Sequence, residues 1–233
     1  MILVARRGDK LRQTCQTLKD RGFSDVLGLP VVTLTPLKPT TPRQAKGVII
    51  TSSAAVPALE GCSLPCYTVG EKTAEAARRA GLDVKHSGKG NAENLSLWLQ
   101  ENINPQEQGV LWHPSTKEAV NEWYTILEKA GIKVLFTEAY KTTYLLKLPH
   151  EVVCCLKENK VSSLLVFSAK GAEKTLALLK AHGFAPAQFK TVAAISENVA
   201  KTLRENGVES SSIRVAKNPL SEDLINVLEQ PTL

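Results

Sequence analysis

Short hydrophobic runs alternate along the chain with longer segments in which hydrophobic residues recur at helical spacing. The runs, which we expect to be strands, are 2–5 (ILVA), 47–51 (GVIIT), 163–167 (SLLVF), 67–69, 110–112, 133–136 and 191–195. Runs of this length without a polar face are typical of parallel sheets that are covered by helices on both sides.

The segments between these runs predict amphipathic helices, and glycine ends several of them. In KLRQTCQTLKDRG, Leu11, Cys15 and Leu18 fall on one face and Gly22 follows the last turn. Three further segments end in the same way: TAEAARRAG (73–81), EWYTILEKAG (122–131) and VAKTLRENG (199–207). Glycine adopts the left-handed conformation past a helix end without a steric penalty. The alternation of strands and helices predicts a doubly wound α/β fold.

The order of segments is repeated in the two halves of the chain. IITSSAAV (49–56) resembles VFSAKGAE (166–173), and VGEKTAEAARRAGL (69–82) resembles ISENVAKTLRENGV (195–208). A third pair is GNAENLSLWL (90–99) and NPLSEDLINVL (218–228). A repeat of this length predicts two domains of similar plan.

Two extended stretches rich in proline or β-branched residues, 29–42 and 136–149, interrupt the alternation. We expect them to be paired linker strands, at about 30–41 and 136–149. The first domain would then be discontinuous. The expected domains are 1–35 plus 150–233, and 42–137.

Composition and charge narrow the class of protein. The chain has 233 residues, 43% hydrophobic and 22% charged, which is typical of soluble globular proteins. The start, MILVARRGDK, does not have the pattern of a signal peptide, and no apolar run approaches the roughly 20 residues that span a bilayer. We therefore expect a cytoplasmic protein that does not contact membranes. An odd count of five cysteines argues against a disulfide framework.

A net charge of +6 is compatible with an anionic partner. Lys and Arg are scattered singly and aromatic residues make up only 5%, so we expect no nucleic-acid partner. The chain has no GxxxxGK[ST] loop and no GxSxG elbow, and its four histidines lack metal-site spacing. Glu93 replaces the third glycine of a dinucleotide fingerprint.

Small polar residues follow the predicted strands, at the edge where open α/β sheets bind ligands. The candidate binding residues are Ser52, Ser53, Lys72, Thr73, Asn91, Ala92, Ser168, Ala169, Lys170, Ser196 and Asn198. Helix starts attract anions through their free N–H groups and the helix dipole. Ser, Thr and Asn at such positions can equally be helix N-caps, so each loop has two interpretations.

Three other residues are candidates for a role at or near a site. His113 directly follows a predicted strand and therefore could face the ligand edge, whereas His182 lies at a helix end, where it would act as a cap. Tyr140 lies in a predicted linker strand. Its phenol can donate a proton or a hydrogen bond, or its ring can simply pack.

The ordered set ILVARRGD, IITSSAAV, YTVGEKTAEAARRAG, GNAENL, EAY, VFSAKGAE and NPLSEDLINVL resembles the uroporphyrinogen-III synthase family over essentially the whole chain. The resemblance implies two flavodoxin-like, doubly wound parallel-sheet domains joined by a two-stranded antiparallel linker. It implies dehydration and cyclisation of hydroxymethylbilane to uroporphyrinogen III, with inversion of the last pyrrole ring, in heme biosynthesis. It also implies that no cofactor or metal is needed and that the chain is a monomer.

The resemblance assigns roles to single residues. Tyr140 matches, by context, the tyrosine that the family is proposed to use as proton donor, and Thr73 matches a threonine of the second-domain loop. Where the family often has threonines, this chain has Ser196-Glu197-Asn198, so Ser196 or Asn198 would donate instead. Lys170 stands in a loop often written Ser-Pro-Ser, where it would supply a positive charge or be plain surface. The alternative is a non-catalytic two-lobed binding protein for an anionic small molecule.

Overall fold

The computed structural model describes residues 1–117, 119 and 122–228. The chain divides into two compact units. Unit 1 comprises Met1–Thr33 and Thr143–Leu233, and unit 2 comprises Leu34–Thr142. The chain passes from one unit to the other inside two extended strands, β2 (Val26–Pro36) and β8 (Tyr140–Tyr144).

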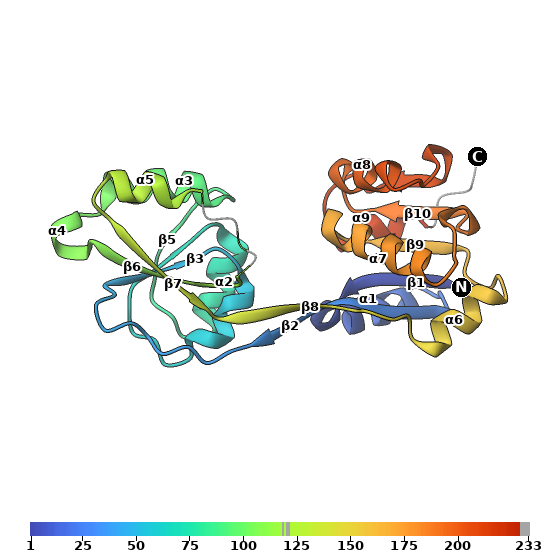
Figure 1. Ribbon diagram of the computed structural model, residues 1–233, viewed down its shortest axis with the longest axis horizontal. Coiled ribbons are helices and arrows are strands. Elements are labelled where there is room, and N and C mark those ends of the chain that lie inside the picture. The colour runs from blue at the N-terminus through green and yellow to red at the C-terminus, as the bar shows by residue number, and fades with distance from the viewer. Residues whose placement is uncertain (118, 120–121, 229–233) are drawn as a thin grey trace. The chain divides into compact units, whose positions relative to one another are not determined.

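Unit 1 is built on a six-stranded sheet with the order β11-β10-β9-β1-β2-β8 (Figure 1). Besides β2 and β8, its elements are β1 (Ile2–Arg7), α1 (Gly8–Asp20), α6 (His150–Lys157), β9 (Ser163–Val166), α7 (Ala169–Ala181), η2 (Pro186–Gln188), β10 (Thr191–Ala194), α8 (Glu197–Glu205), η3 (Ser210–Ser212), β11 (Ile213–Val215) and α9 (Ser221–Asn226). The strands from β11 to β2 are parallel. β8 lies beside β2 at the edge, and Leu145 N donates to Val31 O while Leu37 N donates to Ala139 O, which is the order of an antiparallel pair.

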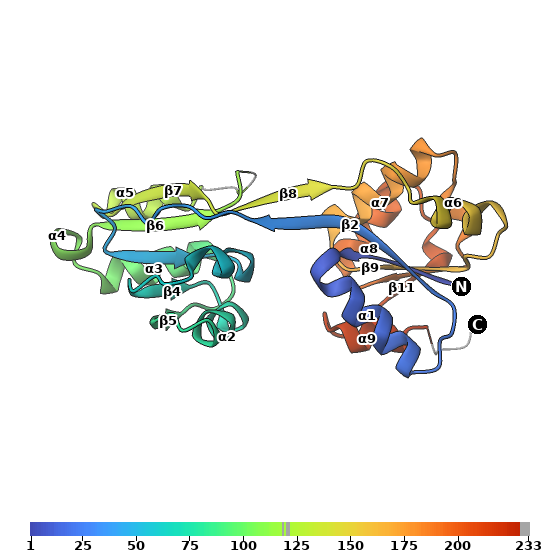
Figure 2. The same ribbon diagram turned by 90° about the horizontal axis from the view of Figure 1, so that it is seen from below.

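The two faces of this sheet are covered by different helices. Leu3 and Ala5 of β1 point into a hydrophobic cluster formed with α6, α7 and α8. Ile2 and Val4 point to the other face, into a cluster with α1 and α9. Figure 2 shows α1 and α9 on the same side of the sheet. Because successive residues of a strand face opposite ways, a strand buried on both sides must be hydrophobic throughout, as ILVA is.

Unit 2 is built on a five-stranded parallel sheet with the order β5-β4-β3-β6-β7. Its elements are β3 (Gly47–Ile50), η1 (Ser53–Leu59), β4 (Cys66–Thr68), α2 (Glu71–Arg79), β5 (Val84–Ser87), α3 (Ala92–Asn102), α4 (Pro105–Gln108), β6 (Val110–Ser115), α5 (Tyr124–Lys129) and β7 (Lys133–Glu138). Figure 1 shows α3 and α5 on one side of this sheet and α2 on the other. Val48 and Ile50 pack toward η1 and α2, and Ile49 packs toward α3 and α5.

The expected α/β class is confirmed, with predominantly parallel sheets in both units. Each of the seven hydrophobic runs lies in or overlaps a strand. Gly22 and Gly207 follow their helices with φ of 89° and 86°, so the predicted glycine ends are also confirmed there. Two short edge strands, β5 (VKHS) and β11 (IRV), were not expected, because polar residues leave neither of them a hydrophobic run.

The extended stretches differ in extent from the expected linker strands. The first strand begins at Val26, because its residues up to Val32 pair with β1, and it ends at Pro36. In the second stretch, residues 136–138 belong to β7 and only Tyr140–Tyr144 form β8.

All five cysteines are free thiols. None of the helices in the described part of the chain is long and apolar enough to cross a bilayer.

Candidate functional site

The loops that leave β3, β4 and β5 lie together at the carboxyl edge of the unit 2 sheet. Val69 N donates to Ile50 O at 3.2 Å, Gly88 N donates to Thr68 O at 2.7 Å, and Gly90 N donates to Val69 O at 2.6 Å. The structure thus brings six of the candidate residues to one edge: Ser52, Ser53, Lys72, Thr73, Asn91 and Ala92.

Two of these residues are helix caps. The Ser52 side chain accepts a hydrogen bond from Ala54 N at 3.2 Å, at the start of η1. The Asn91 side chain accepts from Asn94 N at 2.7 Å, at the start of α3. Ser53 and Ala92 are the first residues of these helices. For Ser52 and Asn91 the capping interpretation is therefore confirmed, and their side-chain oxygens already have a donor.

The start of α2 differs, because no side chain caps it. Its N-cap is Gly70, in an extended conformation, and the acceptor for both Thr73 N and Ala74 N is the carbonyl of Gly70. The N–H groups of the first turn, at Glu71 and Lys72, point out of the helix start. Thr73 is buried at 8% exposure, and Lys72 is exposed. This loop offers backbone donors to an anion.

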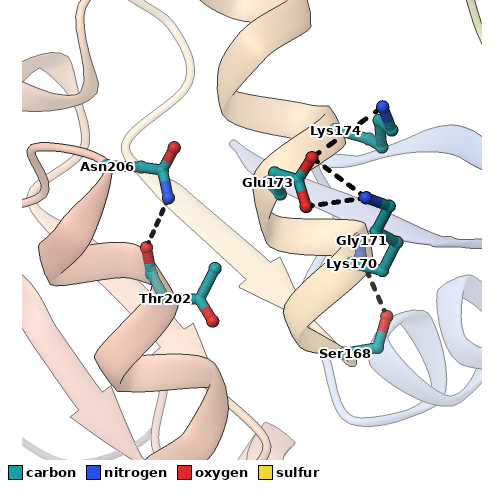
Figure 3. Close-up of polar contacts among 7 residues, drawn as sticks. All are labelled: Ser168, Lys170, Gly171, Glu173, Lys174, Thr202 and Asn206. Carbon is teal, nitrogen blue, oxygen red and sulfur yellow. Dashed lines mark hydrogen bonds and ion pairs between the residues drawn. The ribbon is translucent and has the colours of Figure 1, made fainter.

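In unit 1, the loops after β9 and β10 are neighbours, since Ile195 N donates to Val166 O at 3.2 Å. Ser168 caps α7, accepting from Gly171 N at 3.1 Å, and Ala169 is the first helical residue (Figure 3). Lys170 forms an ion pair with Glu173 at 2.9 Å (Figure 3). Its positive charge is already balanced on the same helix.

The start of α8 resembles that of α2. Ser196 stands at the N-cap position, in an extended conformation, without a side-chain capping bond. Asn198 is exposed in the first turn, and its carbonyl accepts a hydrogen bond from Thr202 Oγ1 at 3.2 Å. The Thr202 carbonyl in turn accepts from Asn206 at the other end of the helix (Figure 3). These two uncapped helices occupy equivalent positions in the internal repeat, VGEKTAEA and ISENVAKT.

Tyr140 begins β8, with Ala139 directly before it. Tyr140 is only 7% exposed, and its ring belongs to the hydrophobic cluster that contains Val48, Ile50 and Trp112. The ring therefore packs in the core of unit 2, and a role for the hydroxyl as proton donor stays a prediction.

The two histidines with expected roles differ in outcome. His182 ends α7 and its Nδ1 lies 2.9 Å from the carbonyl of Leu178, so the prediction of a cap is confirmed. His113 does not face solvent at the ligand edge, because it is only 1% exposed. It is hydrogen-bonded to Thr51 and Tyr124, and burial lowers the pKa of its imidazole to about 4. Residue spacing alone could not show this burial.

Sequence reasoning also missed Arg6, at the end of β1. Its guanidinium lies 4.0 Å from the centroid of the Phe167 ring, and it donates hydrogen bonds to Thr14 and, at 2.9 Å, to Ser221. The signal was available in the sequence, because Arg6 directly follows the hydrophobic run at 2–5. Among the described residues, no group of three or more His, Cys, Asp or Glu side chains is placed to hold a metal ion.

Comparison with known proteins assigns this arrangement to a family. The family model described as uroporphyrinogen-III synthase HemD matches residues 12–226. A crystal structure of uroporphyrinogen-III synthetase from Helicobacter pylori 26695 is similar, with 20% identity, a TM-score of 0.67, and coverage of 98% of this chain and 97% of that one.

A second similar structure is a mutant uroporphyrinogen III synthase from the extremely thermophilic bacterium Thermus thermophilus, with 17% identity and a TM-score of 0.57. The alignment covers 98% of this chain and 95% of that one. A sequence search of curated proteins finds no match. At these identities the two structures show a shared fold, and the family model carries the assignment. The chain belongs to the uroporphyrinogen-III synthase family.

Proposed function

We propose that this chain is a cyclising lyase that converts hydroxymethylbilane into uroporphyrinogen III, with loss of water and inversion of the last pyrrole ring, in porphyrin and heme biosynthesis. The observation that carries the proposal is the family match over residues 12–226. The family acts on a tetrapyrrole, so a non-catalytic anion-binding protein is not the favoured interpretation.

The demands of the reaction fit the chemistry of the two sheet edges. The linear substrate carries acetate and propionate carboxylates, and it closes without help to the unwanted isomer. The protein must therefore hold the chain in one geometry more than it must accelerate bond formation. Backbone N–H groups at helix starts bind carboxylates without a cationic side chain, and the uncapped starts of α2 and α8 supply such groups.

Within these edges, we assign binding roles to the residues that the sequence singled out. Lys72 and Thr73 act at the start of α2, and Ser196 and Asn198 act as donors at the start of α8. The remaining contacts are made by the backbone of Ser52, Ser53, Asn91, Ala92, Ser168, Ala169 and Lys170. Side chains already used as caps leave the adjacent N–H groups as the binding elements.

Tyr140 is the proposed general acid. Loss of the terminal hydroxyl group as water requires a proton, and a phenol that is protonated at neutral pH can supply it.

We also propose the domain organisation and the setting of the enzyme. Its domains are 1–35 plus 150–233 and 42–137. Both domains are flavodoxin-like, and two antiparallel linker strands join them. The enzyme works as a monomer in the cytoplasm, without nucleic-acid or membrane partners.

The test is a measurement of isomer composition. The purified chain is incubated with freshly prepared hydroxymethylbilane, the products are oxidised to porphyrins, and isomers I and III are separated by chromatography. Isomer III in excess over a control without protein supports the proposal. Isomer I alone, at the rate of the protein-free control, would reject it.

A further inference from the structure

The buried imidazole of His113 connects three elements of unit 2. His113 lies in β6, near the carboxyl end of the strand. Its Nε2 is 2.9 Å from Oγ1 of Thr51, the residue that follows β3. Its Nδ1 is 2.5 Å from the hydroxyl oxygen of Tyr124, the first residue of α5. Both ring nitrogens therefore have a partner, which is the condition for burying a polar ring without a large penalty.

The chemistry of the two hydroxyl groups sets the direction of these hydrogen bonds. Burial lowers the pKa of His113 to about 4, so the ring is neutral at neutral pH and carries one N–H. A phenol is a stronger donor than an aliphatic hydroxyl group, so Tyr124 donates to Nδ1. Nε2–H then donates to Thr51 Oγ1, and the hydroxyl proton of Thr51 is left to donate elsewhere.

Aromatic packing fixes the orientation of the imidazole ring. Trp123, Tyr124 and Phe136 make edge contacts with it, at centroid distances of 5.0, 5.6 and 6.4 Å. The rings of Trp123 and Tyr124 also contact each other edge-on, with their centroids 4.4 Å apart. A ring enclosed in this way cannot turn without displacing its neighbours. The N–H group at Nε2 of His113, which donates to the Thr51 hydroxyl oxygen, is therefore held in a fixed position.

Thr51 is half-buried and directly precedes Ser52 and Ser53 at the carboxyl edge of the sheet. We propose that His113 is a positioning residue, which holds the loop of Thr51, Ser52 and Ser53 in the geometry that binds a substrate carboxylate. This inference rests on the proposed function, because that function makes the loop part of the substrate site. His113 itself does not touch the substrate, and it acts through Thr51.

The test compares Thr51→Val, Thr51→Ser and His113→Phe with the wild-type chain in the isomer III assay. Valine keeps the shape of threonine but loses the acceptor for Nε2–H. We expect KM to rise about five- to tenfold, as for the loss of one hydrogen bond, with kcat within about twofold. Thr51→Ser should restore KM. Thr125→Val is the matched control, since Thr125 is exposed on α5 and its hydroxyl group donates to the Glu122 carbonyl, not to His113.

A spectroscopic readout separates positioning from simple loss of stability. In the wild-type chain, the ¹⁵N shifts of the His113 ring should show a protonated Nε2 and an unprotonated Nδ1. Thr51→Val should shift the Nε2 signal and leave Tyr124 bonded to Nδ1. If His113→Phe does not fold, Thr51→Val and its serine rescue still decide the question.

The outcomes are distinct. Isomer I alone from the wild-type chain would reject the proposed function. Isomer III from the wild type, with an unchanged KM in Thr51→Val, would reject the positioning role and leave the proposed function in place. A raised KM that Thr51→Ser does not restore would also reject it, because the hydroxyl group would then not be the cause.

Discussion

Arg204 Nη1 donates a hydrogen bond to Glu197 Oε1 at 2.7 Å, across two turns of α8. Arg78 and Glu71 repeat this pair on α2, at 2.5 Å. In each helix the glutamate is the first helical residue, and no side chain caps the helix. The arginine offsets a negative charge that would otherwise repel a carboxylate at the helix start. The hydrogen bond that Arg78 donates to Glu71 is the main cause that lowers the pKa of that carboxyl.

Arg78→Ala should therefore weaken substrate binding, although Arg78 need not touch the substrate. We expect KM to rise about two- to fivefold, because Glu71 would then oppose an anion at the helix start. The effect should be larger at low ionic strength, since both side chains are exposed. Arg79→Ala is the matched control, because Arg79 pairs with Glu75, away from the helix start. Equal changes in KM for the two variants would contradict the idea.

Replacement by alanine should mainly affect stability at Ser168 and mainly affect KM at Ser196. Ser168 caps α7 through Gly171 N, so Ser168→Ala should lower the free energy of unfolding by about 1 kcal/mol. Ser196 makes no capping bond, so Ser196→Ala should change stability by much less and should instead raise KM. Urea denaturation and steady-state kinetics measure the two effects. A stability loss in Ser196→Ala as large as that in Ser168→Ala would assign Ser196 a structural role.

These serines show how far the sequence predicts the site. The pattern of strand, small polar residue and helix predicts that each candidate loop lies at a sheet edge, because the carboxyl ends of parallel strands share one edge of a sheet. It could not separate a cap from a ligand-binding group, since both uses favour the same small polar residues. Ser168 and Ser196 differ in side-chain geometry, which cannot be predicted from the residue type alone.

The fold was predictable where a local rule decides it. A strand buried on both faces must be hydrophobic, and a helix that ends in the left-handed region favours glycine, so β1 and the turn at Gly22 followed from the sequence. The hydrogen bond between Thr51 and His113 depends on the pairing of β3 with β6 and joins residues 62 positions apart. No local pattern in the sequence indicates such a contact.

Tyr140→Phe tests the proposed acid. The ring packs in the core of unit 2, and phenylalanine keeps that packing, so the melting temperature should change little. If the phenol supplies the proton, kcat should fall by about 100-fold or more while KM stays within about twofold. Tyr144→Phe, on the same strand, is the control. A variant that keeps the wild-type rate of isomer III formation would show that another group donates the proton.

The burial of His113 should make the stability of the protein depend on pH. In the unfolded chain the imidazole takes up a proton near pH 6.5, whereas in the folded chain it does so only near pH 4. Between these values the unfolded state binds more protons, so acidification favours unfolding. The contribution of a neutral His113 is complete above pH 6.5 and is lost as the pH falls toward 4. At about 1.4 kcal/mol per pH unit, the loss is about 3 kcal/mol.

Urea denaturation of His113→Gln between pH 7 and pH 5 isolates this contribution, because most carboxyl groups stay ionised in that range. The variant should be less stable than the wild-type chain at pH 7, and its stability should fall less steeply with acidification. His150→Gln, which changes an exposed histidine of α6, should keep the wild-type slope. Equal slopes in His113→Gln and the wild type would mean that His113 takes up protons in the folded state as readily as in the unfolded state. The buried imidazole, hydrogen-bonded to both Thr51 and Tyr124, would then be contradicted.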